Sequence, residues 1–451
     1  MTVKNNPLFC YDKVEFFPQG PVDYMLVTRP DKNTERLSPF VHQPVVFSYD
    51  EEGIEHMELA ADSKVCFRYY PQASGNYSFS VYYNGMAGET IALTVQPSAH
   101  HGYVTVSKRD ARYFSYTDGS GFFPIGINLA YPIAYGKHSG IEFGLINSFG
   151  FLGLRQYERW FQKCAVHGVN VARIWLGHEY FCPDTEICGE FRYEQFSKLD
   201  RLLELAKTYG IKLKLTLEQF RFFDYDRKAD TDSYHDDIFR KFNKKLYLDG
   251  VRCEGPQSWM AQRQWQDQWL LKVREFAKRY SGDSSIFAIE LWNEMNSIEG
   301  MAEVIAWNRI MLTAVKELFP HNMVINSLGS YDADHADEWY RSFCWDLCDF
   351  KQMHRYLDQG AADEACRNDP ADMIVDGIRR LNGNVQPFFV AETGAVNPCH
   401  SGPFKYYVND DRGILFVDMV YTPLFTGAAG CGNIWHWDDR YVESKNLYQF
   451  Q

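Results

Sequence analysis

Beyond residue 112 the sequence alternates between short apolar, strand-like runs and longer helical stretches, and this alternation limits the possible folds more than any other feature. The strand-like runs occur at 122–130, 169–176, 211–220, 286–294, 323–329, 349–356, 387–394 and 432–439. Stretches with helical periodicity follow the first four runs, at 154–168, 193–210, 265–282 and 301–319. The first three of these helical stretches end in glycine, which is typical of a helix C-terminus. Repeated strand–helix units of this kind predict a (β/α)8 barrel over residues 113–451.

Two features of this region bear on the barrel prediction. A doubly wound parallel sheet is the alternative, but it needs a glycine-rich phosphate turn after its first strand, and "GINLAYP" at 126–132 is not one. The last predicted strand ends near residue 439 and the sequence ends at residue 451, which leaves no room for a full eighth helix. We therefore expect the barrel to close in another way or to be truncated.

Residues 1–112 have a different pattern, typical of an all-β domain. In "NYSFSVYYNG" at 76–85 the side chains of Tyr77, Phe79, Val81 and Tyr83 share one face of a strand. A turn follows, and "IALTVQP" at 91–97 alternates again. Short strands separated by turns predict a small antiparallel sandwich. This region carries no catalytic motif, so we expect it to brace the barrel, with carbohydrate binding as the alternative.

Composition and charge exclude several classes of partner. Lys and Arg number 46 against 59 Asp and Glu, so the net charge is −13, which argues against nucleic acid and anionic membranes. The 11 cysteines are scattered without zinc-type spacing, which suits a reducing compartment. The N-terminal segment has no apolar signal core, and no apolar run is long enough to span a membrane. These observations predict a cytoplasmic protein and leave self-association as homo-oligomers open.

Polar side chains cluster where the predicted strands end, which is where barrels of this kind hold their catalytic residues. Glu294 follows Asn293 at the end of one strand, and Glu392 lies near the end of another. The other polar and aromatic residues near strand ends are Arg173, His178, Glu218, His354, Tyr356, Trp435 and Trp437. Two carboxylates on facing strands, with aromatic rings around them, indicate glycoside hydrolysis. Such a pair needs different protonation states, so we expect Arg173 to keep Glu392 ionised while Glu294 holds its proton.

Two segments resemble the catalytic strands of clan A glycoside hydrolases, most closely family 5 and its neighbours: "FAIELWNEMN" at 287–296 and "FFVAETGA" at 388–395. The resemblance implies that Glu294 is the acid/base, that Glu392 is the nucleophile, and that Asn293 holds the sugar 2-hydroxyl. It also places Arg173 as the clan's strand-two arginine. "MHRY" at 353–356 resembles the strand-six motif, with Tyr356 near the nucleophile. "WHWDD" at 435–439 resembles the strand with the platform tryptophan, which is Trp435 or Trp437.

The sequence thus predicts a retaining glycosidase that acts on a β-linked sugar, needs no metal or cofactor, and prefers small oligosaccharides or glycosides in an exo mode. A transglycosylase and a non-catalytic sugar-binding protein are the alternatives. A metal-dependent barrel hydrolase would need a His-x-His pair at the end of the first strand, which "GINLAYP" lacks.

Each prominent carboxylate also has a structural interpretation. Glu294 could cap a helix, Glu392 could form only an ion pair with Arg173, and we expect Glu290 to be a structural partner beneath Glu294. The acidic segment 224–237 is predicted to be a solvated insertion or a cap over the site, and its spacing does not match a calcium-binding loop.

Overall fold

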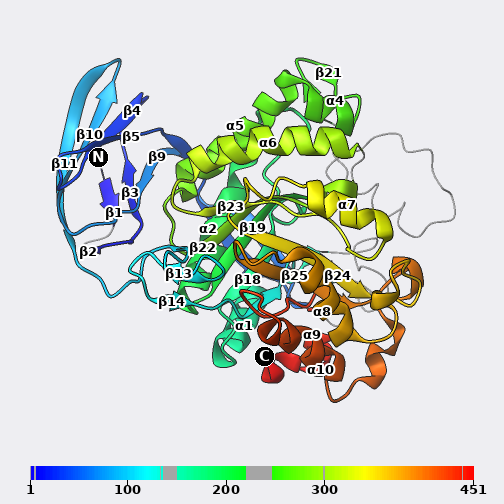
Figure 1. The fold of residues 1–451 in the computed structure, drawn as a ribbon. Coiled ribbons are helices and arrows are strands. Elements are labelled where there is room, and N and C mark those ends of the chain that lie inside the picture. The colour runs from blue at the N-terminus through cyan, green and yellow to red at the C-terminus, as the bar shows by residue number, and fades with distance from the viewer. Residues whose placement is uncertain are drawn as a thin grey trace.

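The computed structural model describes residues 2–4, 7–132, 134–135, 150–219, 246–297, 300–438 and 440–451 (Figure 1). The predicted segment 224–237 lies outside the described residues. The core of the larger domain is a parallel sheet with the order β15-β18-β19-β22-β23. Its strands are β15 (Gly126–Asn128), β18 (Val171–Trp175), β19 (Lys212–Gln219), β22 (Ile286–Asn293) and β23 (Met323–Ile325). A second parallel pair, β24 (Lys351–Leu357) and β25 (Phe388–Ala395), continues the ring.

Backbone hydrogen bonds close this ring into a barrel. The Asp349 N–H, just before β24, donates to the Val324 carbonyl of β23 at 3.1 Å. On the other side, the segment around Ile434 lies between β25 and β15. The Asn433 N–H donates to Val390 at 3.0 Å, and the Asn128 N–H donates to Ile434 at 3.3 Å. The predicted order of the barrel is therefore confirmed for seven strands, and a short segment around Ile434 takes the place of the eighth.

That closing segment corrects one prediction. The sequence predicts a strand over 432–439, whereas the structure has only an isolated parallel bridge between Thr393 and Ile434. The reason is a tight turn: the Trp437 N–H donates to the Trp435 carbonyl at 2.8 Å, two residues back, which ends strand pairing. In place of a long eighth helix, residues 440–451 form the short α10 (Val442–Lys445) and a 3-10 turn, and the Gln451 side chain donates to the Gly126 carbonyl at 2.7 Å.

Amphipathic helices cover the outside of the barrel (Figure 1). They are α1 (Gly153–Val166), α2 (Tyr193–Thr208), α5 (Arg263–Tyr280), α6 (Met301–Leu318), α7 (Asp334–Ser342), α8 (Pro370–Leu381) and α9 (Ile414–Phe425), with the short α4 (Pro256–Ala261) before α5. In α5 the buried side chains of Trp265, Trp269, Val273 and Phe276 are spaced four, four and three residues apart, so they form one apolar stripe. This periodicity is what the sequence displays, and it fixes which face of each helix packs on the strands.

A small sheet covers the end of the barrel where the strands begin. It consists of β12 (Val104–Val106), β13 (Phe114–Tyr116) and β14 (Gly121–Phe122). The Phe114 ring makes edge contacts with Phe287 at 5.3 Å and Phe350 at 5.3 Å, and both partners lie at the starts of barrel strands. The predicted domain boundary at residue 112 falls within this sheet, and the division into residues 1–112 and 113–451 stays a prediction.

The N-terminal domain contains two sheets around a shared core (Figure 1). One sheet has the order β1-β3-β9-β6 and the other β2-β11-β10-β4-β5. Their strands are β1 (Thr2–Lys4), β2 (Leu8–Phe9), β3 (Val14–Phe17), β4 (Tyr24–Thr28), β5 (Thr34–Leu37), β6 (Phe40–His42), β9 (Lys64–Tyr69), β10 (Gly75–Tyr83) and β11 (Met86–Gln96). Phe16 and Phe79 meet between the sheets at 4.4 Å, and Tyr77 and Val81 are buried beside them. Pairing is antiparallel except between β2 and β11.

Two further observations concern the location of the protein. No helix in the described part of the chain is long and apolar enough to cross a membrane. All 11 cysteines are free thiols, and most of them are buried. The cytoplasmic location stays a prediction.

Candidate active site

Arg173 organises the base of the site at the mouth of the barrel. Its guanidinium is fully buried and its three nitrogens contact side chains from three directions. Nε donates to Glu290 at 2.7 Å and Nη2 donates to the Asn293 Oδ1 at 2.6 Å. Nη1 forms an ion pair with Glu392. A guanidinium is a planar fork with fixed donor directions, so it holds these three groups at defined relative positions.

Glu290 lies beneath the mouth, and both of its carboxylate oxygens contact protein side chains. Besides Arg173, its oxygens accept from Thr216 and, at 2.6 Å, from the Gln352 amide, and the Lys214 ammonium is 3.6 Å away. Burial alone would raise the pKa of this carboxyl, but Arg173 and Lys214 hold that pKa well below its ordinary value. Glu290 is thus a permanently ionised carboxylate within a buried polar layer, the position expected of a structural partner.

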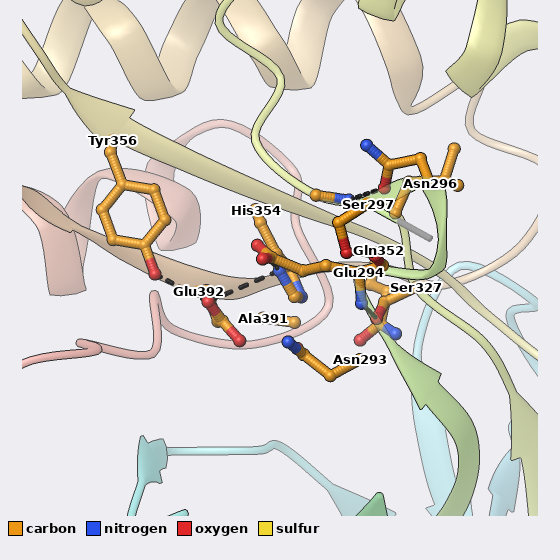
Figure 2. Close-up of polar contacts among 12 residues, drawn as sticks. Asn293, Glu294, Asn296, Ser297, Ser327, Gln352, His354, Tyr356, Ala391 and Glu392 are labelled. Atoms are coloured by element: carbon orange, nitrogen blue, oxygen red, sulfur yellow. Dashed lines mark hydrogen bonds and ion pairs between the residues drawn. The ribbon is translucent and has the colours of Figure 1, made fainter. Parts of the chain in front are cut away.

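Glu392 is buried, at 2% exposure, and its Oε1 pairs with Arg173, while Figure 2 shows its contacts with Tyr356 and His354. The Tyr356 hydroxyl donates to Oε2 at 2.6 Å, and the His354 Nδ1 lies 3.4 Å from the same oxygen. Burial raises the pKa of this carboxyl, while Arg173 and the Tyr356 hydrogen bond oppose that rise. The expected pairing of Arg173 with Glu392 is therefore present, and it offsets part of the desolvation.

Glu294 stands beside Glu392 in a different environment. Its side chain is 20% exposed, and its Oε1 lies 2.9 Å from the His354 Nδ1. One carboxyl oxygen each of Glu294 and Glu392 and one ring nitrogen of His354 all lie within 4.8 Å of one another. Burial raises the pKa of Glu294 well above its ordinary value and the charge of Glu392 raises it further, while the Arg173 charge opposes the rise and Asp332 adds to it. Unlike Glu392, this carboxyl accepts no hydrogen bond from Arg173, so the rise in its pKa is less strongly opposed.

His354 lies between the two carboxyls with one ring nitrogen directed at them (Figure 2). It is fully buried, and burial together with the Arg173 charge holds its pKa well below the ordinary value, so the imidazole is neutral. Its Nε2 has no hydrogen-bond partner among the described residues, and neither has the buried Asn293 Nδ2. Buried polar atoms are nearly always satisfied in native proteins, so these two atoms are candidate contacts for a polar ligand.

Aromatic side chains form a second group at the mouth, hereafter the aromatic wall, which consists of Trp175, Trp435, Trp437, Tyr131 and His178. Trp435 contacts Trp175 at 4.8 Å and Trp437 at 4.9 Å between ring centroids. Tyr131 contacts Trp437 at 5.1 Å and stacks on the His178 ring at 4.3 Å. Trp437 is buried whereas Trp435 is partly exposed, which favours Trp435 as the surface available to a ligand.

One predicted site residue, Glu218, lies apart from both the carboxyl pair and the aromatic wall. The Glu218 carboxylate lies against α5, where it accepts from the Trp269 indole at 3.0 Å and pairs with Lys272. Burial raises its pKa to about 7. The side chains of Lys214 and Thr216 point into the barrel, but this alternation does not extend to Glu218 at the end of β19. His178 belongs to the aromatic wall.

Sequence reasoning missed several residues that support the site. Asn128, at the end of β15, is fully buried, and its amide donates to the Ala391 and Ile434 carbonyls at 3.1 Å, which ties three barrel segments together. Its position at the end of the first strand was a usable signal. Ser327 accepts from the Glu294 N–H at 3.0 Å. It lies within the predicted strand run 323–329, but β23 ends at Ile325, so Ser327 is in the loop that follows.

A second polar cluster lies next to the mouth. Besides Glu294, His354 and Glu392, one further trio of described side chains brings possible metal-ligand atoms within 4.8 Å of one another: Asp332, Asp358 and His400. Asp358 accepts the N–H of His400 at 3.0 Å, and the His400 Nε2 lies 2.5 Å from Asp332. The His400 ring also contacts Tyr356 at 5.4 Å, so this cluster borders the site. Its hydrogen bonds account for the geometry without an ion, and the predicted absence of a cofactor stays a prediction.

Comparisons with known proteins bear on the fold. No protein-family model matches the chain, and no curated protein matches it. Among solved structures, a candidate glycoside hydrolase from Bacteroides vulgatus ATCC 8482 aligns over 95% of this chain and 71% of its own, with 13% identity and a TM-score of 0.53. A family 5 mannosidase from Rhizomucor miehei aligns over 75% and 86%, with 15% identity and a TM-score of 0.48. An exo-β-1,4-mannosidase from Opitutaceae bacterium strain TAV5 covers 76% and 57%, with 15% identity and a TM-score of 0.46. The first of these shows a shared fold over nearly the whole chain.

Proposed function

We propose that this protein is a retaining glycoside hydrolase that cleaves a β-linked sugar. The observation that carries the proposal is the close approach of Glu294 and Glu392, whose nearest oxygens lie within 4.8 Å. Retaining enzymes hold their two carboxyls about 5–5.5 Å apart, whereas inverting enzymes keep about 6.5–9.5 Å to admit a water molecule. The resemblance of the two strands to those of clan A supports a substrate whose glycosidic bond has the β configuration.

The two carboxyls divide the reaction between them. Glu392, oriented by Arg173 and Tyr356, attacks the anomeric carbon as the bond to the leaving oxygen breaks. Glu294 gives its proton to that oxygen, so the leaving group departs neutral. In the second step the Glu294 carboxylate takes a proton from water, whose oxygen attacks the anomeric carbon and releases Glu392. The sugar keeps its configuration, and both carboxyls return to their starting states.

The surrounding residues have roles that follow from their exposure and charge. The Asn293 Nδ2 is placed to donate to a sugar hydroxyl, since its Oδ1 is occupied by Arg173. His354 is neutral, so it can contact both carboxyls without fixing the charge on either. Trp435 offers a partly exposed ring on which a sugar face can stack.

A panel of aryl glycosides, covering both anomers and several sugars, together with β-linked disaccharides, tests the proposal. Wild-type protein should release product from one β-glycoside, and Glu392→Ala should abolish that release while remaining folded by circular dichroism. Glu317→Ala, at an exposed position of α6, is the control and should keep the wild-type rate. NMR of the first product should show the β anomer.

Four results would overturn or revise the assignment. An unaffected rate in Glu392→Ala would show that Glu392 is not the nucleophile. An α anomer as the first product would exclude a retaining mechanism. Sugar binding without turnover across the whole panel would identify a non-catalytic binder. Transfer of the sugar to an acceptor in place of water would redefine the enzyme as a transglycosylase with the same two carboxyls.

A further inference from the structure

The N-terminal domain reaches the mouth of the barrel through one hairpin. This hairpin consists of β7 (Val45–Tyr49) and β8 (Glu55–Leu59). At its tip Ile54 packs so closely on Gly150 that a Cβ there would lie 2.3 Å from the isoleucine Cγ2. Gly150 immediately precedes Phe151, which contacts the His178 ring of the aromatic wall at 5.7 Å. The hairpin therefore lies on the catalytic side of the barrel.

Glu55, the first residue of β8, makes a concentrated set of contacts to the barrel. One oxygen accepts from the Leu154 N–H at 2.6 Å and from the Tyr49 hydroxyl at 3.1 Å. The other accepts from the Tyr180 hydroxyl at 2.6 Å. Only 2% of the side chain is exposed, and the Lys198 ammonium lies 3.9 Å away. Leu154 is in the first turn of α1, whose unpaired N–H groups and positive dipole end favour a carboxylate.

A continuous chain of contacts leads from Glu55 to the substrate side of the site. Tyr180, which bonds Glu55, donates its N–H to the His178 Nδ1 at 3.2 Å. His178 stacks on Tyr131, and Tyr131 contacts Trp437, as described above. One carboxylate thus holds both the start of α1 and the loop after β18, the two segments that support the aromatic wall.

We infer that Glu55 is a positioning residue, through which the N-terminal domain sets the aromatic wall against which the sugar of the proposed reaction binds. This inference rests on the proposed glycosidase function. Glu55 touches neither Glu294 nor Glu392, so its loss should weaken substrate binding and leave the chemical step intact. The N-terminal domain is then a part of the substrate site as well as a brace.

A second interdomain contact supplies the control. Arg68 of β9 pairs with Glu15 at 2.6 Å and with Asp200 of α2 at 2.8 Å, and it donates to the Arg279 carbonyl at 3.2 Å. Arg279 is in the last turn of α5. Because the helices run antiparallel to the strands, that turn lies at the opposite end of the barrel from the catalytic carboxyls. Glu15→Ala therefore weakens the same domain interface without touching the aromatic wall.

The experiment compares wild type, Glu55→Ala, Glu55→Gln and Glu15→Ala by hydrogen-exchange mass spectrometry, thermal melting and kinetics on the preferred aryl β-glycoside. Glu55→Ala should speed amide exchange in segments 150–155 and 177–182 and raise KM on the order of tenfold, with kcat kept within about twofold. Glu55→Gln keeps one acceptor and the side-chain length, so it should restore part of the loss. Glu15→Ala should lower the melting temperature and leave KM and the exchange of both segments unchanged.

The outcomes separate this inference from the function on which it rests. If wild type cleaves no glycoside, the proposed function fails, while the exchange data still decide whether Glu55 holds the two segments. Wild-type exchange in both segments of Glu55→Ala would overturn the inference. Equal changes in KM for Glu55→Ala and Glu15→Ala would overturn it too, because the effect would then come from interface stability alone. If Glu55→Ala does not fold, the same comparisons apply to Glu55→Gln.

Discussion

The proposal that Glu294 is the proton donor can be tested with the substitution Glu294→Gln. This substitution removes the carboxyl proton but keeps the size and the contacts of the side chain. The His354 Nδ1 lies 2.9 Å from the Glu294 Oε1, and the carboxamide of glutamine can form the same hydrogen bond in either direction, with its oxygen as acceptor or its NH2 group as donor. Arg173 does not contact this side chain, so Glu294→Gln leaves the other carboxyl and its partners in place. The variant lacks only the transferable proton.

General acid catalysis contributes about 10²–10⁴-fold to a rate, which equals roughly 2.7–5.4 kcal/mol at 1.36 kcal/mol per tenfold change. A sugar leaving group needs the whole of this contribution because an alkoxide is a poor leaving group. A dinitrophenolate leaves without a proton. We therefore expect Glu294→Gln to lower kcat/KM on a disaccharide within that range and to change cleavage of a 2,4-dinitrophenyl glycoside far less. Equal losses on both substrates, measured by initial rates, would refute the assignment of the acid.

The same variant tests the raised pKa through stability. Burial and Glu392 raise the folded-state pKa of Glu294, while the unfolded chain has the ordinary value of about 4.3. A raised folded pKa contributes stability that is full below the unfolded pKa and is lost as pH rises through the folded pKa. Wild type should therefore lose stability relative to Glu294→Gln between about pH 4 and the folded pKa. Urea unfolding at pH 4 and pH 8 measures this, and a constant difference would contradict it.

Three other substitutions have directional consequences. Tyr356→Phe removes the 2.6 Å hydrogen bond that lowers the pKa of Glu392, so the acidic limb of the pH profile of kcat/KM should move to higher pH. Asp332→Asn removes a negative charge that raises the pKa of Glu294, so the alkaline limb should move to lower pH; an unmoved limb would exclude that coupling. Arg173→Met leaves two carboxylates buried without their shared cation and should cost about 3–5 kcal/mol in urea unfolding, where a loss below about 1 kcal/mol would contradict its role.

The sequence predicts most of the barrel because its strands and helices carry strong periodicities, and parallel strands bring their ends together. The sequence predicts for that reason that Glu294, Glu392, Arg173 and Tyr356 lie together, and their side chains do; their roles stay a prediction. The Glu218 carboxylate could not be placed, because its orientation depends on where the alternation of β19 ends. Ser327 was predicted within the strand run 323–329, but β23 ends at Ile325, and the contact of Ser327 with the Glu294 N–H depends on loop geometry that periodicity does not predict.

β22, the strand that carries Glu290 and Asn293, departs from regular strand alternation at its end. Glu290 and Asn293 are three residues apart, and a regular strand would point them to opposite faces, yet both contact the Arg173 guanidinium. The next residue, Glu294, has a φ of 51°, in the left-handed region that costs roughly 1–2 kcal/mol for a side chain with a Cβ. Ser327 offsets part of this cost, because its hydroxyl accepts from the Glu294 N–H at 3.0 Å and donates to the Trp292 carbonyl at 3.0 Å. With regular alternation the strand could supply Glu290 or Asn293 to Arg173, but not both. The irregularity is therefore what lets one strand anchor the base of the site and still place the Glu294 carboxyl at its mouth.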